Sequence, residues 1–490
     1  MTGAEDQTKG HFNPWPAMVT ILIANFMNLI DVTIVNVALP SLQKGLGATA
    51  SQIEWVVAGY ILIFALGLLP MGRLGDIVGR KRLFLIGVSV FTLASAICGL
   101  SPTIGALIAA RVLQGAAAAV MLPQVLAIAQ NLFAPRERAT AFALFSLSAG
   151  LASVAGPLLG GLLISFDIYG LSWRPIFLIN LPIGLAALWF GQRLIPDIPG
   201  DPKLRNDWAG IGIVALAMFC IIFPLVEGRE FGWPAWSFLM MMAAVPLFAW
   251  FVMWESRQAR HGAPQLMPVH LLKNWNFAIG SGMSLIFFSA LPAFFLVFAV
   301  YLQNGYGLTP LQSGLTTVPF PLGVLLASVI TSQLGPNWLR ARIFVGIGIL
   351  WISVFSVRNV VLGTEDVLNH WDYVVPLFFA GLGLGLSIAP LFQAILAGVP
   401  VHDAGSGSGA LQAIQQAGGA LGIAVVSQVF FSTLGGGMAQ GMEHHAVYRG
   451  AFSAALIYNL TAYVLVGIGA MILRAGSFDD QVSTKPVTAE

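Results

Sequence analysis

The sequence predicts an all-α membrane protein of about fourteen transmembrane helices. Hydrophobic residues make up 57% of its 490 residues and charged residues only 9%, whereas a soluble domain carries about 25% charged residues. So few charges cannot cover a surface exposed to water. Apolar segments of about 20 residues recur along the whole chain, and this is the length that an α-helix needs to cross about 30 Å of hydrocarbon.

The expected spans fall into a block of six, a pair and a second block of six. The first six lie at 17–38, 53–72, 83–100, 103–126, 139–165 and 174–192. The pair lies at 209–226 and 236–254, and the last six lie at 276–302, 311–333, 342–361, 372–398, 406–434 and 449–473. The run 17–38 is too long for the apolar core of a signal peptide, so we expect it to remain as the first helix.

These segments predict five parts of the chain. They are a cytoplasmic N-terminal segment 1–16, a six-helix bundle 17–193, a linker 194–275 with two inserted helices, a six-helix bundle 276–474 and a cytoplasmic tail 475–490. Orientation follows from Lys and Arg, which accumulate on the cytoplasmic side. With the N-terminus inside, the outer side receives only Lys44, Arg174, Arg229, Arg358 and Arg449 of the 23 Lys and Arg residues. An even number of spans with both termini inside explains this bias.

Two echoes at similar spacing indicate an internal repeat. The pair Leu74-Gly75, followed by basic residues, is matched 260 residues later by Leu334-Gly335. The glycine-rich segment 155–161 is echoed by 417–422. We therefore expect two parallel six-helix repeats with two helices inserted between them, an architecture of transporters whose halves rock around a site near the middle of the bilayer.

Composition also excludes several classes of function. The net charge is only +2 and the longest basic run is the segment 80–82, so no nucleic-acid partner is expected. Cys98 and Cys220 lie in apolar stretches and are typical of packing residues. The histidines fall in loops or termini, so we expect no metal site and no cofactor. No cluster of a nucleophile with a base indicates an enzyme.

Asp31 is the most informative residue, because an ionisable group within a span is costly unless it is paired or functional. It lies about seven residues before the outer end of its helix, and Arg111 lies about eight residues from the outer end of the fourth helix. At about 1.5 Å per residue, both are about 11 Å deep, and we expect them to pair. Our hypothesis is that Asp31 binds a proton or a cationic substrate while Arg111 tunes it. A structural ion pair is the alternative.

The segment 72–82 is expected to be a short cytoplasmic loop between the second and third helices. Its glycines permit a tight turn, and Asp76 is placed to cap a neighbouring helix. A contact made in only one state would make this loop a gate between the two open forms, with a simple positive anchor as the alternative. The candidate gating residues are Gly72, Asp76, Gly79, Arg80 and Lys81.

Small residues concentrate in the fifth helix around a proline. Gly156, Pro157, Gly160 and Gly161 predict a bent helix whose small face lets another helix approach closely. Ordinary packing explains some of these glycines, whereas their concentration beside Pro157 favours a moving interface.

Several amides are candidates for lining a central cavity. Asn28 lies in the first helix, and Gln114 follows Arg111 by three residues in the fourth. Gln412, Gln415 and Gln416 share one face of the thirteenth helix. Hydrogen bonding between helices without ligand contact is the alternative for each of them.

Four motifs together resemble the major facilitator superfamily, specifically the fourteen-helix drug:proton antiporters of the EmrB/QacA type. They are the segments 29–40 (LIDVTIVNVALP), 72–82 (GRLGDIVGRKR), 111–115 (RVLQG) and 156–161 (GPLLGG). The resemblance spans roughly residues 15 to 475. Ile77, where a basic residue is frequent, and Ala152, where glycine is frequent, depart from the pattern and leave the gating detail open.

The resemblance implies a site and a direction of transport. It implies that Asp31 and Arg111 take part in proton coupling, that the segment 72–82 gates, and that the Gly156-Pro157 element belongs to antiporters, which favours export. Some relatives that export divalent cations carry an acidic residue in the tenth helix. None is present at 311–333, so dicationic substrates are not expected.

The expected function is proton-coupled efflux of small lipophilic or monocationic compounds by alternating access. A carrier for one metabolite or antibiotic is the alternative, and a non-transporting membrane receptor or assembly protein is a remote one. We expect a multi-pass protein of the bacterial inner membrane with protons, the small-molecule substrate and the lipid bilayer as partners. Some relatives also work with a periplasmic adaptor protein.

Overall fold

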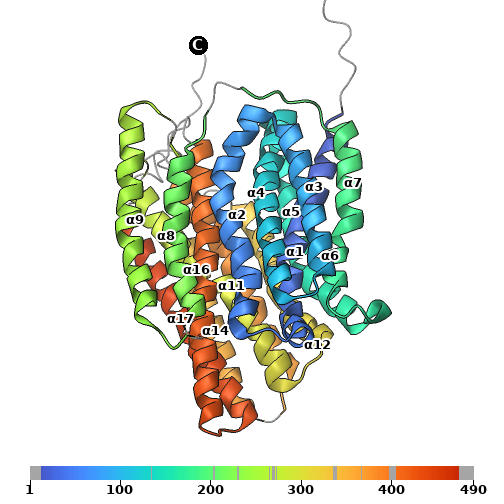
Figure 1. The fold of residues 1–490 in the computed structure, drawn as a ribbon, viewed down its shortest axis with the longest axis vertical. Helices are drawn as coiled ribbons and strands as arrows, with labels where there is room; N and C mark the ends of the chain where they lie inside the picture. Colours follow the sequence, from blue (N-terminus) through green and yellow to red (C-terminus); the bar gives the residue numbers. More distant parts are fainter. Residues whose placement is uncertain are drawn as a thin grey trace, which may run out of the picture.

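The computed structural model describes residues 13–133, 135–201, 205–228, 231–263, 265–266, 271, 273–334, 339–365, 367–396 and 404–473, which form helices and connections without strands. Thirteen of these helices are long and apolar enough to cross a membrane. A further helix of 31 residues, α5 (Pro135–Ser165), lies among them. The expected all-α architecture of about fourteen spans is confirmed (Figure 1).

The first half contains six crossings, and two consecutive helices form the sixth. Its helices are α1 (Trp15–Leu46), α2 (Ala50–Val78), α3 (Arg80–Leu100), α4 (Ile104–Leu132), α5, α6 (Pro175–Leu178) and α7 (Asn180–Leu194), with a 3-10 turn η1 (Ile168–Gly170) after α5. The inserted pair is α8 (Trp208–Glu227) and α9 (Ala235–Arg260).

The second half repeats this order. Its helices are α11 (Trp275–Val300) with a π-helical turn η2 (Tyr301–Gly305), α12 (Pro310–Thr317), α13 (Pro319–Leu334), α14 (Leu339–Gly363), η3 (His370–Tyr373), α15 (Val374–Leu396), α16 (Ala404–Ala439) and α17 (His444–Ile472). The helices α12 and α13 together form one crossing, as α6 and α7 do.

Identical capping boxes begin the second crossing of each half. The Thr49 hydroxyl accepts from the N–H of Gln52, whose side chain accepts from the N–H of Thr49. Thr309 and Gln312 form the same pair at the start of α12. Such a box satisfies two N–H groups that the first helical turn leaves unpaired. The spacing of 260 residues is that of the sequence repeat.

The two halves also share a packing pattern. In the first half α1 packs against α5 and α7, and α4 packs against α2 and α3. In the second half α11 packs against α16 and α17, and α15 packs against α13 and α14. Because corresponding crossings meet in the same way, the two parallel six-helix repeats are present in space as well as in sequence.

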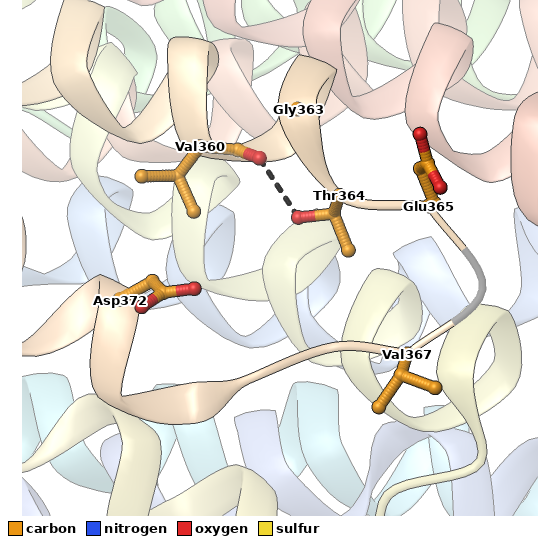
Figure 2. Close-up of a pocket in the computed structure, with 6 residues that line it drawn as sticks. All are labelled: Val360, Gly363, Thr364, Glu365, Val367 and Asp372. Carbon is orange, nitrogen blue, oxygen red and sulfur yellow. Dashed lines mark hydrogen bonds between the residues drawn. The ribbon is translucent and has the colours of Figure 1, made fainter.

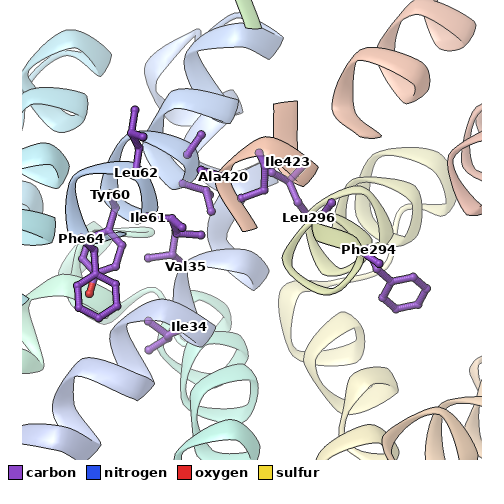
Figure 3. Packing of buried hydrophobic residues seen from close by; sticks show 14 of the residues in the cluster. Ile34, Val35, Tyr60, Ile61, Leu62, Phe64, Phe294, Leu296, Ala420 and Ile423 are labelled. Carbon is purple, nitrogen blue, oxygen red and sulfur yellow. The ribbon is translucent and has the colours of Figure 1, made fainter. Parts of the chain in front are cut away.

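The interface between the halves, called the seam below, runs between α2 and α16 on one side and between α5 and α12 on the other. In Figure 3, Ile61 lies between Tyr60 on its own helix and Ala420 of α16. The inserted helix α8 packs against both α2 and α16, and α9 packs against α8. The inserted pair therefore covers one side of the seam.

Two ends of the bundle are distinguished below. The basic end carries Arg80, Lys81 and Arg82 and is the upper end in Figure 1. The opposite end carries the α1–α2 and α16–α17 connections. The expected loop 72–82 at the basic end is wrong in extent, because α2 continues to Val78 and α3 begins at Arg80. Only Gly79 breaks the helix, with a φ of 106° that disfavours any side chain.

Candidate functional site

A buried ion pair joins α1 to α4. The Nη1 of Arg111 donates to Oδ2 of Asp31 at 2.6 Å, and both side chains are almost completely shielded from solvent. The pairing expected from helix depth is confirmed. The pair lies inside the first half, whose helices α1, α3, α4 and α7 surround it, and not at the seam.

The second oxygen of Asp31 is held by two amides. Oδ1 accepts from Nε2 of Gln114 at 2.8 Å and from Nδ2 of Asn180 at 2.9 Å. The Ser95 hydroxyl accepts from the same two amides, at 3.1 and 2.8 Å, and donates to the main-chain oxygen of Phe177. We call Asp31, Ser95, Arg111, Gln114 and Asn180 the carboxylate cluster. It joins four helices of the first half.

The guanidinium of Arg111 is oriented by three further groups. Its Nε donates to the main-chain oxygen of Val56, and its Nη1 also donates to Oε1 of Gln114. The ring of Tyr60 lies over the guanidinium, 4.1 Å from carbon to ring centroid, and its hydroxyl donates to Asn28 at 2.6 Å. A cation held over a ring face is stabilised by the ring quadrupole, so α2 also contributes to the site.

The cluster is a charge-balanced polar site within an apolar bundle. Burying two charges costs several kcal/mol each, and their attraction offsets this cost only when further hydrogen bonds satisfy both groups. Here Asp31 accepts three hydrogen bonds, and the arginine has three acceptors and a ring face. A buried pair adds little stability compared with apolar residues of the same size, so stability alone does not explain the arrangement.

The glycines of α5 let it approach α1 and α12 closely, as expected. A Cβ at Gly156 would overlap Oγ1 of Thr33, and a Cβ at Gly160 would lie 2.8 Å from Cγ1 of Ile34. At Gly161 a Cβ would lie 2.6 Å from the Cα of Leu311 on α12. The segment that begins at Gly156 therefore lies on the seam, at the opposite end of the bundle.

The candidate gating residues contact one another and the linker. Asp76 pairs with Arg80 at 2.5 Å, one helical turn apart. The start of α3 has no side-chain cap, and the expected cap of a neighbouring helix by Asp76 stays a prediction. Lys81 pairs with Asp197 at 3.2 Å, while Gly72 lies inside α2 beside Pro123.

Of the amides expected to line a cavity, two belong to the ion-pair site. Gln114 is in the carboxylate cluster, and Asn28 accepts from Tyr60. Gln412, Gln415 and Gln416 are half-buried on α16, on the far side of the seam, and Nε2 of Gln415 has no hydrogen-bond partner among the described residues. The structure therefore separates the two groups.

A surface hollow lies elsewhere, at the opposite end between α14 and η3 (Figure 2). Its lining residues are Val360, Gly363, Thr364, Glu365, Val367 and Asp372. The Thr364 hydroxyl donates to the main-chain oxygen of Val360 inside it. None of the predicted site residues lines this hollow, and it is open to solvent.

Sequence reasoning missed Tyr60, Ser95 and Asn180. Tyr60 was not recognised because an aromatic residue in a span is usually a packing residue. Asn180 lies six residues into the expected span 174–192, near enough to its start that a polar residue is typical of a helix end. No sequence pattern marks it as a partner of Asp31.

Comparisons with known proteins show the family to which the chain belongs. The family model of the Major Facilitator Superfamily matches residues 21–423. This chain belongs to the Major Facilitator Superfamily. It is 39% identical over 422 residues to a probable actinorhodin transporter of Streptomyces coelicolor, covering 86% of this chain and 73% of the relative. It is 32% identical over 433 residues to the tetracenomycin C resistance and export protein of Streptomyces glaucescens, covering 86% and 77%.

A solved structure supports the superfamily fold. The inward-facing, unoccupied crystal structure of a bacterial homologue of the human lysosomal transporter Spinster superposes with a TM-score of 0.65 at 17% identity, covering 94% of this chain and 98% of that chain. The resemblance that the four motifs indicated is thus confirmed at the level of the superfamily, and the chain is a multi-pass membrane transporter by family.

Proposed function

We propose that this protein is a proton-coupled exporter of small lipophilic or monocationic compounds, in which Asp31 binds the proton. The observation that carries the proposal is the carboxylate cluster, whose Asp31 lies on α1, a helix that also contacts α11 and α12 of the second half. An ionisable residue at this depth is a functional site by default. A proton-driven transporter needs such a group to connect the gradient to a conformational change.

Protonation of Asp31 can affect the contact between the two halves through α1. The main-chain oxygen of Val37 accepts a hydrogen bond of 2.8 Å from Nε2 of Gln303, on η2 of the second half. Val37 is six residues beyond Asp31, about 9 Å along α1. A change in how α4 and α7 hold α1 therefore acts on a helix that is bonded directly to the other half.

Protonation of Asp31 would remove the charge that holds Arg111. The arginine would then lack a counter-ion, and the hold of α4 on α1 would weaken, since breaking a buried pair costs about 3–5 kcal/mol. A proton that moves through 100 mV supplies about 2.3 kcal/mol. The energy from one proton is of the same order as this cost, although smaller, so protonation of Asp31 is able to bias the balance between the two states.

Direction and substrate class are proposed from the relatives and from the resemblance. The two relatives described above are named for actinorhodin transport and for tetracenomycin C export. The cluster is sealed inside the first half and cannot touch a substrate in this state.

A carrier for one compound is the second candidate. It is favoured by the names of both relatives, each of which specifies a single compound. The breadth of the substrates accepted distinguishes it from a multidrug exporter.

We place the protein in the bacterial inner membrane with both termini and the basic end in the cytoplasm. The accumulation of Lys and Arg at that end supports this orientation. A periplasmic adaptor is a further partner that the resemblance implies.

The experiment uses inverted membrane vesicles that contain the full chain and a pH-sensitive dye. The vesicles are energised and given ethidium, puromycin or tetracenomycin C. Proton release that depends on the compound is expected in the parent and not in Asp31→Asn. Glu255→Gln, which changes another fully buried carboxylate on the inserted helix α9, is the matched control and should behave as the parent.

The outcomes separate the candidates. A response to several unrelated compounds supports the multidrug exporter, and a response to tetracenomycin C alone supports the narrow carrier. An unchanged response in Asp31→Asn would remove Asp31 from the coupling mechanism. No response to any compound in the parent would contradict the proposed export.

A further inference from the structure

Asn180 has one hydrogen-bonding atom that the carboxylate cluster leaves unused. Both hydrogens of its Nδ2 are donated, to Asp31 and to Ser95. Its Oδ1 is buried and has no partner among the described residues. A buried acceptor without a donor is destabilising, so its persistence in a satisfied cluster needs an explanation.

The donors and acceptors show which form of Asp31 this arrangement fits. All three groups that bind its carboxylate are N–H donors, from Arg111, Gln114 and Asn180. A carboxylate only accepts, whereas a protonated carboxyl group also donates one O–H. The present arrangement therefore satisfies the charged form, and among the described residues no group bonded to Asp31 is an acceptor for the protonated form.

Among these partners, Asn180 is the best placed to serve the protonated form. Oε1 of Gln114 is already occupied by Arg111 and by the Cys98 thiol, and the Ser95 hydroxyl accepts from two amides. Turning the Asn180 amide about its last side-chain bond exchanges Nδ2 and Oδ1, which brings a free acceptor to Oδ1 of Asp31. Asn180 is also the first residue of α7.

We propose that Asn180 is a positioning residue for the proton-binding step at Asp31, which it holds through Nδ2 when the carboxylate is charged and through Oδ1 when the carboxyl group is protonated. This inference rests on the part of the proposed function that gives Asp31 the proton. The other ionisable groups that interact with Asp31 are Arg111 of α4, Tyr60 of α2 and Cys98 of α3. The described side chains of α5, α6 and α7 present none at the cluster.

The test is infrared difference spectroscopy of the full-length protein in lipid nanodiscs during a pH titration, with no substrate present. The C=O stretch of the protonated Asp31 carboxyl group is assigned as the band that Asp31→Asn lacks. In Asn180→Leu, which replaces the amide by an apolar group of similar size, the band should move to higher frequency because its O–H loses an acceptor.

The midpoint of the titration should also move in Asn180→Leu. Hydrogen bonds to a charged group are stronger than those to a neutral group, so the charged form loses more, and the midpoint should rise by about one pH unit, a tenfold change in proton affinity. Asn180→Thr keeps a group that both donates and accepts. In this variant the band should return to its parental frequency, and the midpoint should recover at least half of the shift seen in Asn180→Leu. Asn459→Leu changes an equally buried amide of α17 in the other half and should match the parent.

The proposal is overturned if the band and midpoint of Asn180→Leu match those of the parent, if Asn459→Leu shifts them equally, or if Asn180→Thr restores neither. It is also overturned if the parent shows no Asp31 band in the titration. Because no substrate is used, failure of the export experiment with the expected infrared result would contradict the proposed transport and leave the role of Asn180 standing.

Discussion

The side-chain amide of Gln303 donates to the main-chain oxygen of Val37 at 2.8 Å, which bonds the π-helical turn after α11 to α1 across the seam. A second bond, from Nδ2 of Asn304 to Oε1 of Gln43, lies nearby at 3.3 Å. Gly161 and Leu311 are also in close contact. The two halves are therefore in direct contact at the end of the bundle opposite to the basic end. Alternating access requires that such contacts break in each cycle.

The first prediction concerns Gln303→Leu. Loss of one buried hydrogen bond is expected to weaken closure by about 0.5–1.5 kcal/mol, which raises the open population by a factor of about 2–10. A cysteine introduced at Val37, buried in this state, should react faster with a membrane-impermeant maleimide by that factor. Gln440→Leu, at an exposed glutamine at the end of α16, is the control, and equal rates in the two variants would show that the Gln303 bond does not hold the seam.

The second prediction concerns Gly161→Ala. The added Cβ would lie 2.6 Å from the Cα of Leu311, and overpacking of this kind costs about 1–3 kcal/mol. The closed state should lose stability, so proton release in the vesicle assay should slow. The cysteine introduced at position 37 should again react faster with the maleimide. Gly467→Ala on α17 has open space around its new Cβ and should leave both measurements unchanged. Normal rates in Gly161→Ala would contradict the tight seam.

Much of this fold could be predicted from the sequence, because apolar length, the distribution of charge and the repeat act at long range. The pairing of Asp31 with Arg111 followed from helix depth alone. The two capping boxes, at Thr49 and Thr309, were also visible as Thr-x-x-Gln patterns spaced 260 residues apart, although their meaning depends on where a helix starts.

The rest could not be predicted, because it depends on how side chains rotate and how connections fold back. Whether an amide in a span faces lipid, another helix or the ion pair depends on rotation about the helix axis, and a depth estimate does not give this angle. For Asn180 this rotation decides its role. The single-residue break at Gly79 was hidden because glycine-rich segments suggest loops, whereas two helices here meet end to end.

The third prediction concerns the linker, which lies over this break. The N–H of Asp201 donates to the main-chain oxygen of Asp76 at 2.6 Å, and Gly200 packs so closely on the break that a Cβ would lie 2.7 Å from the nitrogen of Gly79. Gly200→Ala should displace the linker, and trypsin should then cleave after Arg205 several times faster. Gly212→Ala, with open space around its Cβ, is the control. Equal cleavage of the two variants would show that the linker is not held by this contact.

The fourth prediction concerns the inserted helix α8. Its Glu227 accepts from Nε1 of Trp55 on α2 at 2.8 Å, and Nδ2 of Asn206, just before α8, donates to the main-chain oxygen of Pro70 on the same helix. Trp55→Phe keeps an aromatic ring and removes a hydrogen bond to a charged group, worth about 1.5–3 kcal/mol. The thermal midpoint in detergent should fall by a few degrees. Trp208→Phe, at an exposed tryptophan, should not change it, and a similar midpoint in Trp55→Phe would mean that α8 is held by apolar packing alone.

The fifth prediction separates a functional ion pair from a structural one. Arg111→Leu leaves Asp31 buried without its partner and should destabilise the protein by about 3–5 kcal/mol, whereas the double variant Asp31→Leu/Arg111→Leu should regain most of that loss, because apolar residues replace a buried pair at little cost. Thermal unfolding of both variants in detergent measures the difference. If the ion pair serves proton coupling, the double variant should be stable and should still fail to release protons in the vesicle assay. A stable double variant that exports at the parental rate would show that the pair is dispensable, and coupling would then have to reside in another buried carboxyl group, such as that of Glu54 on α2.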